Sequence, residues 1–390
     1  MPSHVVPPAI KAKAAQALDT AIAQVASNRE QFRFVFPDDT TQNQVYLPLN
    51  LSGFPVGSNS GWTSGLWTGQ VWLAYELSKD EGFRGVAEDH VKSFAQRVQT
   101  QHDLATHDLG FLYMPSCVAA HRLTGSELGK HSALQAADAL LERFLAKAGV
   151  IQAWGDLNDP EQRGRMIIDC LMNLPLLRWA STITGNSSYR EAADTHAQRA
   201  RQYVVRPDAS TYHTYHFDPV TGAPLKGTTH QGYSDNSCWA RGQAWGIYGF
   251  ALNHRYAPQL DLLGTSVRLA DYFLSHLPDD GVAYWDLIFG KESTEPRDSS
   301  SSAIAVCGLL ELSEQLPAGP QSDHYHAEAL RLLQGLIDTC AGRPPETKAV
   351  LLHGVYHKGR NHGVDEANLW GDFFFMEALA RVARDWKPYW

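Results

Sequence analysis

One carboxylate stands inside an otherwise apolar run of the chain, in the stretch MIIDCLMNLP at residues 166–175. This residue is Asp169. A charged side chain is rarely buried without a partner, and an unpaired carboxylate in apolar surroundings takes up a proton. We therefore expect Asp169 either to meet a buried partner or to act as an acid whose pKa is tuned by its surroundings.

A second carboxylate, Asp108, lies in the stretch THDLGFLYMPS at residues 106–116. An Asp before an apolar helical run is a frequent N-cap, so this residue can simply serve the helix that follows it. It can equally share a cavity with Asp169, if the two segments that carry them are neighbours in the fold.

Four tryptophans accompany small residues in the stretches GWTSGLWTG and SCWARGQAW, namely Trp62, Trp67, Trp239 and Trp245. A single tryptophan usually belongs to the core, but four in such surroundings favour a flat aromatic surface on which a sugar ring can stack. Arg241 falls between two of them. Its guanidinium can pair with a buried Asp, or it can bind a substrate carboxylate through its bidentate fork.

Other candidate residues come from the long segment before Trp239, which contains His213 in TYHTY and His230 and Gln231 in THQGYSD. Single histidines on loops are more often solvated than functional. The sequence has no H-E-x-x-H motif, no EF-hand loop, no G-x-S-x-G, no P-loop and no G-x-G-x-x-G. We therefore expect no metal and no cofactor.

The elements that must position these residues are predicted to be helices of two alternating kinds. One kind is amphipathic, as in IKAKAAQALDTAIAQVAS, where Ile10, Ala14, Leu18 and Ile22 fall on one face. The other kind is apolar all round and rich in small residues, which is typical of buried helices. The amphipathic segments are 10–27, 82–100, 132–148, 189–205, 263–277 and 324–339, and the buried ones start at residues 64, 109, 166, 238, 300 and 369.

The two kinds alternate six times with a period of roughly 60 residues, which indicates a repeat of helical hairpins. The fold class is therefore predicted to be all-α. Six hairpins can close into an (α/α)6 barrel, and an open solenoid fits the same repeat. We prefer closure, because the candidate residues lie near the starts of the buried helices, as if around one mouth. Loops 51–63, 206–237 and 292–302 would cover that mouth, and residues 1–390 would form a single domain.

Composition narrows the classes of function. A formal net charge of -9 argues against nucleic acid as a partner, because phosphate binding needs clustered Lys and Arg. The five cysteines form no C-x-x-C pair, so we expect reduced thiols. There is neither a signal-peptide pattern at the N-terminus nor an apolar run of 18 residues, so we expect a soluble cytoplasmic protein without a membrane partner. The oligomeric state stays open.

Several stretches together resemble the unsaturated glucuronyl hydrolases, glycoside hydrolase family 88. They are HDLGF, IIDCLMNLPLLRWA, THQGYSDNSCWARGQAWGIYGFA and LWGDFFFMEAL, which occur in this order between about Trp62 and Trp370. The resemblance implies an (α/α)6 barrel, a cytoplasmic enzyme, and removal of the 4,5-unsaturated uronic acid that polysaccharide lyases leave at the non-reducing end of oligosaccharides.

The resemblance also implies roles for individual residues. Asp169 matches the catalytic acid and base, and Asp108 matches the second essential carboxylate. Asp169 would protonate C4 of the enol ether and then accept a proton from the water that adds at C5, while Asp108 would either keep Asp169 protonated or hold sugar hydroxyls. Substrate-binding positions are matched by Trp62, His107, His213, His230, Gln231, Trp239, Arg241 and Trp245.

One segment departs from the family members that act on sulfated disaccharides. Where those members have a Ser/Lys-containing segment, this chain has HKGRNH at residues 357–362. We expect His357 and Arg360 to line the sugar subsite beyond the uronate, with Arg360 pairing a sulfate or a second carboxylate. His357 and His362 would help only when protonated, so a preference for anionic substrates should strengthen as the pH falls through about 6.5.

Three alternatives are weighed against this function. An unsaturated rhamnogalacturonyl hydrolase would use the same barrel and reaction, but HDLGF and THQGYSD favour the glucuronyl family. A sugar epimerase of the N-acylglucosamine type would need paired histidines midway along inner helices, which the sequence lacks. A catalytically silent carbohydrate-binding barrel would give no reason to bury Asp169.

Overall fold

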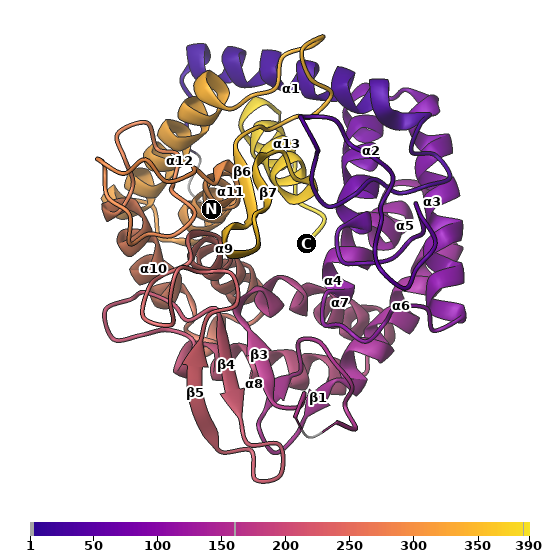
Figure 1. The fold of residues 1–390 in the computed structure, drawn as a ribbon, viewed down its shortest axis with the longest axis vertical. Coiled ribbons are helices and arrows are strands. Elements are labelled where there is room, and N and C mark those ends of the chain that lie inside the picture. Colours follow the sequence, from indigo (N-terminus) through magenta and orange to yellow (C-terminus); the bar gives the residue numbers. More distant parts are fainter. Residues whose placement is uncertain (1–3, 160, 385) are drawn as a thin grey trace.

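The computed structural model describes residues 4–159, 161–384 and 386–390, which form a ring of helices in two layers (Figure 1). The outer helices are α1 (Pro8–Arg29), α3 (Glu81–Gln99), α6 (Glu127–Glu142), α8 (Ser187–Tyr203), α10 (Leu263–Ser275) and α12 (Pro320–Thr339). The inner layer holds α2 (Ser64–Ser78), α4 (Leu109–Tyr113) continued by η1 (Met114–Val118) and α5 (Ala119–Thr124), η2 (Ile168–Met172) with α7 (Leu174–Thr184), α9 (Ala240–Tyr256), α11 (Ser299–Gln315) and α13 (Leu369–Ala383).

The ring closes where the last inner helix meets the first elements of the chain. Helix α13 packs against α1, α2 and α11, and each inner segment contacts the next one around the ring. An open solenoid would leave its first and last repeats apart. The predicted all-α fold class and the closed (α/α)6 barrel are therefore confirmed.

The two kinds of helix bury their side chains as their sequences predict. In α8, Tyr189, Ala193 and Ala197 are buried on one face, whereas Arg190 and Arg201 are exposed. In α9, every residue from Ala240 to Asn253 is buried. The helices that end in LTG and ITG have Gly125 and Gly185 in the left-handed conformation, with φ of 72° and 74°, which is a common way for a helix to end.

Short strands supplement the helices. Strands β3 (Arg165–Ile167), β4 (Thr214–Phe217) and β5 (Pro224–Thr228) form an antiparallel sheet at the bottom of Figure 1. Strands β6 (Gly354–His357) and β7 (His362–Glu366) form a hairpin whose turn is η4 (Lys358–Arg360). Smaller elements are β1 (Phe144–Leu145), β2 (Val150–Ile151) and η3 (Pro258–Leu260).

Several predicted boundaries differ from the structure, three of them outside the residues that carry Asp169. The helix expected over 132–148 ends at Glu142, because Phe144–Leu145 pairs with Val150–Ile151 around Gly149, whose φ is 70°. The segment 206–237 is not only a loop, since it contains β4 and β5. The loop expected over 292–302 ends before Ser299, where α11 begins. The first four serines of α11 are buried.

The closed ring encloses one continuous hydrophobic cluster that includes residues from α1 through Trp390. Within the described residues, no helix combines the length and the apolar character needed to cross a membrane.

Candidate active site

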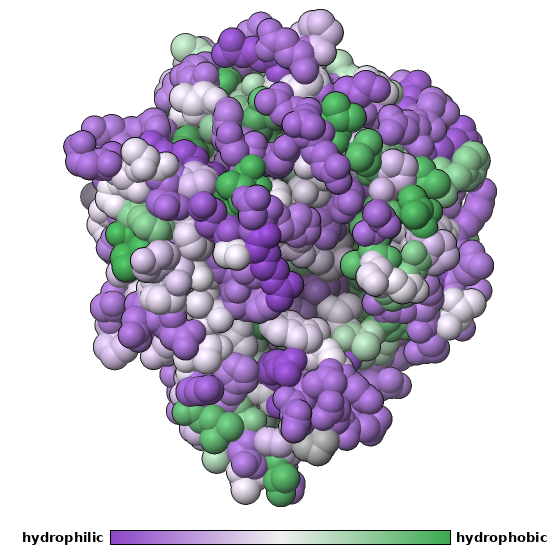
Figure 2. Space-filling view, viewed as in Figure 1, coloured by the Kyte–Doolittle hydropathy of each residue, from purple (hydrophilic) through white to green (hydrophobic). Residues whose placement is uncertain are grey.

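A cavity of about 210 Å³ opens at the end of the barrel where the inner helices begin. The face seen in Figure 2 is hollowed near its centre. Most of the predicted site residues line this cavity: Trp62, His107, Asp108, Asp169, His213, His230, Gln231, Trp239, Arg241 and Trp245. Residues that are separated by more than a hundred positions in the sequence therefore meet in one place.

Asp169 lies at the entry to an inner helix rather than in its middle. Strand β3 ends at Ile167, the Ile168 N–H donates to the His213 carbonyl (3.1 Å), and Asp169 falls in the short 3-10 turn η2. Helix α7 begins only at Leu174, next to Pro175, which has no N–H and favours a helix start. The buried helix predicted from residue 166 therefore starts later than expected, because residues 165–167 pair with β4 and Asp169 lies in the turn between that strand and α7.

Asn173 brings the segments of Asp108 and Asp169 together. Its Oδ1 accepts the Phe111 N–H (2.8 Å) and its Nδ2 donates to the Asp169 carbonyl (3.3 Å). The contact is close because the neighbouring residue is Gly110, where a Cβ would lie 2.3 Å from the Asn173 Cα. The glycine of HDLGF thus allows the approach of the two carboxylates.

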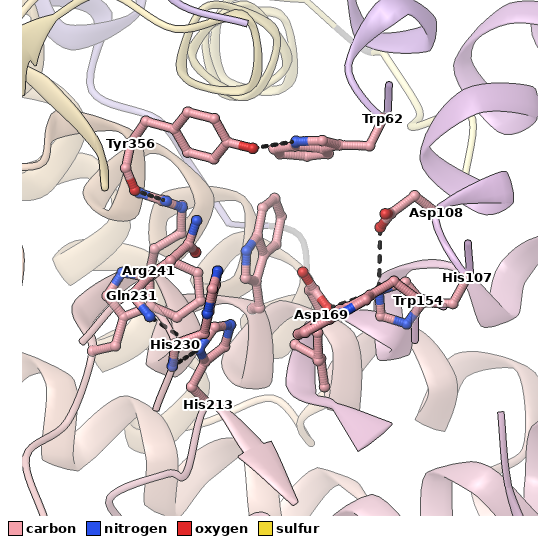
Figure 3. A pocket seen from close by; sticks show the side chains of 13 residues that line it. Trp62, His107, Asp108, Trp154, Asp169, His213, His230, Gln231, Arg241 and Tyr356 are labelled. Carbon is pink, nitrogen blue, oxygen red and sulfur yellow. Dashed lines mark hydrogen bonds and ion pairs between the residues drawn. The ribbon is translucent and has the colours of Figure 1, made fainter. Parts of the chain in front are cut away.

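His107 lies between the two carboxylates (Figure 3). Its Nε2 is 3.3 Å from Asp108 Oδ1 and 3.3 Å from Asp169 Oδ1, and its side chain is only 2% exposed. The His107 backbone N–H donates to the Ala153 carbonyl (2.7 Å). His107 is therefore an ionic link within the cluster as well as a lining residue.

Asp108 is not a helix cap in the usual sense. It precedes α4, but its side chain accepts no hydrogen bond from the helix. The carboxylate instead accepts the Thr106 hydroxyl (2.6 Å) and faces His107. Its position before a helix is therefore not its main role.

The cluster separates the pKa values of its two carboxyl groups. Burial raises the pKa of Asp169 to about 6, against the lowering effect of His107 and with a further rise from the Asp108 charge. Burial acts in the same direction on Asp108, but there the His107 charge, the Thr106 hydrogen bond and Arg143 outweigh it and lower the pKa. Burial would lower the pKa of His107, yet Asp108, Cys170 and Asp169 raise it well above its ordinary value. The arrangement favours a protonated Asp169 beside an Asp108–His107 ion pair.

Aromatic rings form the wall opposite this cluster. The Trp62 indole N–H donates to the Tyr356 hydroxyl (3.1 Å), and the Trp62 ring stacks on Trp370 at 5.0 Å between centroids. Trp245 packs against Phe111 at 5.1 Å. Trp67 does not belong to this wall, because its side chain does not line the cavity and packs edge-on against Phe32 in the core. The expectation that all four tryptophans share one surface is wrong for Trp67.

Arg241 lines the cavity, and three of its five N–H groups donate to the protein. Nη1 donates to Asp298 (2.7 Å) and to the Val355 carbonyl (2.6 Å), and Nη2 donates to the Tyr356 carbonyl (2.9 Å). The guanidinium also lies over the Trp239 ring, 4.5 Å from its centroid. Of the two roles considered from the sequence, the buried ion pair is present, and it also joins α9 to β6.

His213 fixes the loop that carries two other predicted residues. Its Nδ1 accepts the backbone N–H of His230 (2.8 Å) and of Gln231 (3.3 Å). Burial lowers the pKa of His213 well below its ordinary value, so the ring is neutral. Because Nδ1 accepts, the neutral ring carries its proton on Nε2.

The two predicted residues of the HKGRNH segment lie outside the cavity wall. His357 packs against His230 with 5.2 Å between ring centroids, and Arg360 is exposed on η4. Burial, together with the charges of His230, Arg360 and Arg241, lowers the pKa of His357 to about 4. The prediction that His357 becomes protonated as the pH falls through about 6.5 is therefore wrong.

Three lining residues escaped the sequence reasoning: Trp154, Ile167 and Tyr356. Trp154 stands beside Gly155, the same kind of neighbour that singled out the other tryptophans. Tyr356 directly precedes His357 and Ile167 lies two residues before Asp169, so proximity to those candidates was the only signal.

The donor atoms of His107, Asp108 and Asp169 lie within 4.8 Å of one another, a spacing that could hold a divalent cation. Within the described residues, this is the one cluster of three such side chains at that spacing. The same three groups are accounted for as an ion-paired cluster, so their proximity by itself does not require a metal.

Comparison with known proteins gives consistent matches along the chain. The family model for Glycosyl Hydrolase Family 88 matches residues 40–384. An unsaturated chondroitin disaccharide hydrolase of Streptococcus pyogenes serotype M1 is 46% identical over 377 residues, which are 96% of this chain and 92% of the relative. The crystal structure of unsaturated glucuronyl hydrolase from Streptococcus agalactiae has a TM-score of 0.93 at 42% identity, covering 100% of this chain and 95% of the other. A variant of that enzyme complexed with dGlcA-GalNAc6S has a TM-score of 0.85 at 39% identity, with coverage of 100% and 95%.

Proposed function

The chain belongs to glycosyl hydrolase family 88 and removes unsaturated uronic acid from oligosaccharides, and from this premise we propose that Asp169 is the general acid and base of the reaction. The observation that carries the proposal is the position of Asp169 in the cavity, 3.3 Å from His107, with a pKa raised to about 6 by burial. A carboxyl group of this kind holds a proton close to neutral pH and can deliver it.

The substrate's C4=C5 double bond is an enol ether, so the first step is protonation and not displacement at C1. Asp169 gives its proton to C4, which leaves an oxocarbenium-like charge at C5 and a carboxylate on Asp169. Water adds to C5 and gives its proton to that carboxylate. The resulting hemiketal opens to a 5-keto group and a hemiacetal at C1, and the hemiacetal releases the aglycone.

Asp108 and His107 tune the acid in opposite directions. The Asp108 charge raises the pKa of Asp169, which favours the protonated form before the reaction. His107 lowers it, so the imidazolium stabilises the carboxylate that forms after proton transfer. His107 is in this view part of the catalytic machinery rather than only a substrate-binding residue.

The aromatic wall and the loop residues supply binding. Trp62, Trp239 and Trp245 offer faces for the sugar ring, and His213, with its proton on Nε2, can donate a hydrogen bond. His230, Gln231 and Arg241 remain the candidates for the uronate carboxylate. His357 and Arg360 belong to the rim, where the next sugar would lie.

Two finer points complete the proposal. An unsaturated chondroitin disaccharide is the first substrate to test, since the relative from Streptococcus pyogenes is a hydrolase of that disaccharide. The cytoplasmic location that the family resemblance implies is proposed as well, and cell fractionation with antibody detection tests it.

The reaction course is tested by hydrolysis of an unsaturated chondroitin disaccharide in D₂O and in H₂¹⁸O. Enol-ether hydration places one deuteron at C4 of the released keto acid and no solvent oxygen at C1, as read by NMR and mass spectrometry at short times. Product incubated in D₂O without enzyme corrects for exchange. Solvent ¹⁸O at C1 with no deuterium at C4 would contradict the proposal and indicate ordinary glycoside hydrolysis.

A further inference from the structure

Arg143 is a buried cation behind the active site. It directly follows α6 and is 4% exposed. In the part of the chain that the structure describes, no carboxylate oxygen lies within 4.0 Å of its guanidinium, so it has no direct ion-pair partner. Burying a charge without a close counter-ion is costly, and a buried cation of this kind calls for a specific reason.

The guanidinium holds the backbone of the turn 152–155. Nε donates to the Gln152 carbonyl (3.0 Å), and Nη2 donates to the carbonyls of Gly155 (3.1 Å) and Ala153 (3.5 Å). Three carbonyls around one planar cation fix a turn more firmly than a flexible ammonium can, because the guanidinium presents its donors in a rigid fork.

This turn carries parts of the active site. The Ala153 carbonyl also accepts the His107 N–H (2.7 Å), so it connects Arg143 to the backbone of the catalytic cluster. Trp154 lies between two of the held carbonyls, and its side chain lines the cavity near His230, with 5.7 Å between the ring centroids. Displacement of the turn would therefore move both the His107 anchor and one wall of the sugar site.

The charge of Arg143 reaches the same cluster. It contributes to the low pKa of Asp108, while burial lowers the pKa of Arg143 itself to about 10 and the Asp108 charge opposes that lowering. The Asp108 charge also shifts the pKa values of other nearby titratable groups. These are His107, Asp169, Cys170, Asp39, Arg97 and Tyr356. Arg143 does not appear among the main influences on Asp169, so its effect should fall on one carboxyl group of the pair.

We propose that Arg143 is a positioning residue of the reaction, which holds Trp154 and the His107 backbone in place through the turn 152–155. Its charge also favours the ionised form of Asp108. The inference rests on the proposed roles of Asp108, His107 and Asp169. It assigns no contact between Arg143 and substrate.

Two substitutions separate the two parts of the role. Arg143→Lys keeps the charge but loses the planar fork, and Arg143→Gln keeps a hydrogen-bond donor but loses the charge. The matched controls are Arg199→Lys and Arg199→Gln, because Arg199 also donates to a backbone carbonyl, that of Ala148 (2.9 Å), on the adjacent hairpin away from the cavity. The readouts are kcat and KM on an unsaturated disaccharide across pH, with the melting temperature measured alongside.

We expect the acid limb of kcat/KM to move to higher pH by about half a unit or more in Arg143→Gln and to stay in place in Arg143→Lys. The alkaline limb should not move in either variant. KM should rise by about 3- to 10-fold in both, as expected for a displaced aromatic contact. The Arg199 variants should match the wild type in all three quantities.

An unmoved acid limb and an unchanged KM in both Arg143 variants, with only a lower melting temperature, would overturn the inference and leave Arg143 as a structural residue. If Arg143→Gln does not fold, KM of Arg143→Lys decides: a wild-type value overturns the positioning role. If the wild-type pH profile has no acid limb, the role proposed for Asp108 is contradicted instead. Failure of the Arg143 inference and failure of the proposed Asp108 role therefore give different results.

Discussion

Asp108 and Asp169 are chemically identical side chains that the barrel places in different electrostatic positions. Thr106, His107 and Arg143 favour the charged form of Asp108, whereas burial dominates at Asp169. One carboxyl group of the pair is therefore ionised and the other protonated, because their surroundings separate their pKa values. His107 is 3.3 Å from both carboxyl groups and lowers the pKa of each, whereas Thr106 and Arg143 act on Asp108 and are not among the main influences on Asp169.

The pH dependence of the reaction follows from this division. Asp169 must be protonated, and its pKa is about 6, so kcat/KM should fall as the pH rises through about 6. Asp108 must be ionised, and its pKa is lowered, so activity should fall only in acid, below the ordinary range of Asp. A bound uronate adds a negative charge beside Asp169, so the alkaline limb of kcat should lie at higher pH than that of kcat/KM.

Initial rates at saturating and at limiting substrate, measured across pH, check this expectation. Asp194→Asn is the matched control, because Asp194 pairs with Arg178 outside the cavity. An activity that rises steadily from pH 6 to pH 9 would require a deprotonated Asp169 and would contradict the assignment.

At the level of residues, sequence reasoning succeeded where a residue type conflicted with its surroundings. Asp169 stood out because a carboxylate is unexpected among Ile, Cys, Leu and Met, and the structure indeed gives it a buried partner, His107. Trp154 and Tyr356 gave no such conflict, because aromatic residues in loops and short strands are common. The sequence could not decide whether Arg241 pairs with a buried Asp or binds substrate, since its partner Asp298 is 57 residues away in the chain.

Among the elements, the hairpin β6–β7 depends on Arg241 for its attachment to the barrel. Arg241 donates to the carbonyls of Val355 and Tyr356 while it pairs with Asp298. Arg241→Met should lower the free energy of unfolding by about 3–5 kcal/mol, because Asp298 is left buried and unpaired. It should also raise KM, because Tyr356 loses its support.

Urea denaturation and steady-state kinetics check the two effects. The double variant Arg241→Met/Asp298→Asn should recover part of the stability but not the KM, since it removes the unpaired charge without restoring the hairpin contacts. A KM equal to that of the wild type in the single variant would show that the hairpin keeps its place without Arg241.

Arg360 is the exposed cation at the turn of the same hairpin. If the second sugar lies at this rim, Arg360→Ala should lower the ratio of kcat/KM for sulfated over unsulfated disaccharides of one backbone by about 3- to 10-fold, as for a screened charge-assisted contact. The ratio should not depend on pH between 5 and 8 through His357, whose pKa is about 4.

The measurement compares both disaccharides with wild type, Arg360→Ala and Arg343→Ala, where Arg343 is an exposed arginine of another loop. Equal ratios in all three proteins would remove the hairpin from substrate specificity.

The helices were predictable because periodicity reports burial over many residues, and the alternation of amphipathic and all-apolar segments matches the outer and inner layers. The strands were not, because elements such as β1 and β3 are two or three residues long and are defined by partners elsewhere in the chain. The same cause displaced Asp169 from a helix interior to the turn after β3. Local sequence describes propensity, and it does not describe which distant strand pairs with the segment.

At the scale of the whole molecule, the C-terminal end lies inside the ring in Figure 1. The Trp390 indole N–H donates to Glu377 (2.8 Å), and its ring stacks on Phe374 and meets Phe111 edge-on. Phe111 in turn packs against Trp62 and Trp245 of the cavity. We propose that the described residues form one cooperative domain, in which this contact supports the sugar site from behind.

Trp390→Ala should therefore destabilise the whole ring by about 3–5 kcal/mol, because it opens a cavity and leaves Glu377 without one donor. Tryptophan fluorescence and far-UV circular dichroism should report the same lowered urea midpoint. Trp179→Ala is the control, since Trp179 of α7 is only partly buried. Two separate transitions in the variant would contradict the single cooperative unit.

Delivery of the proton from Asp169 to the substrate is tested by the turnover number of Asp169→Asn on an unsaturated disaccharide that the wild type cleaves. Turnover is followed by loss of the ultraviolet absorbance of the double bond. Asparagine keeps the size of the side chain but cannot act as the acid. We predict a kcat at least about 10²-fold lower with nearly unchanged substrate binding and melting temperature, as for loss of a general acid. A turnover number close to that of the wild type would contradict it.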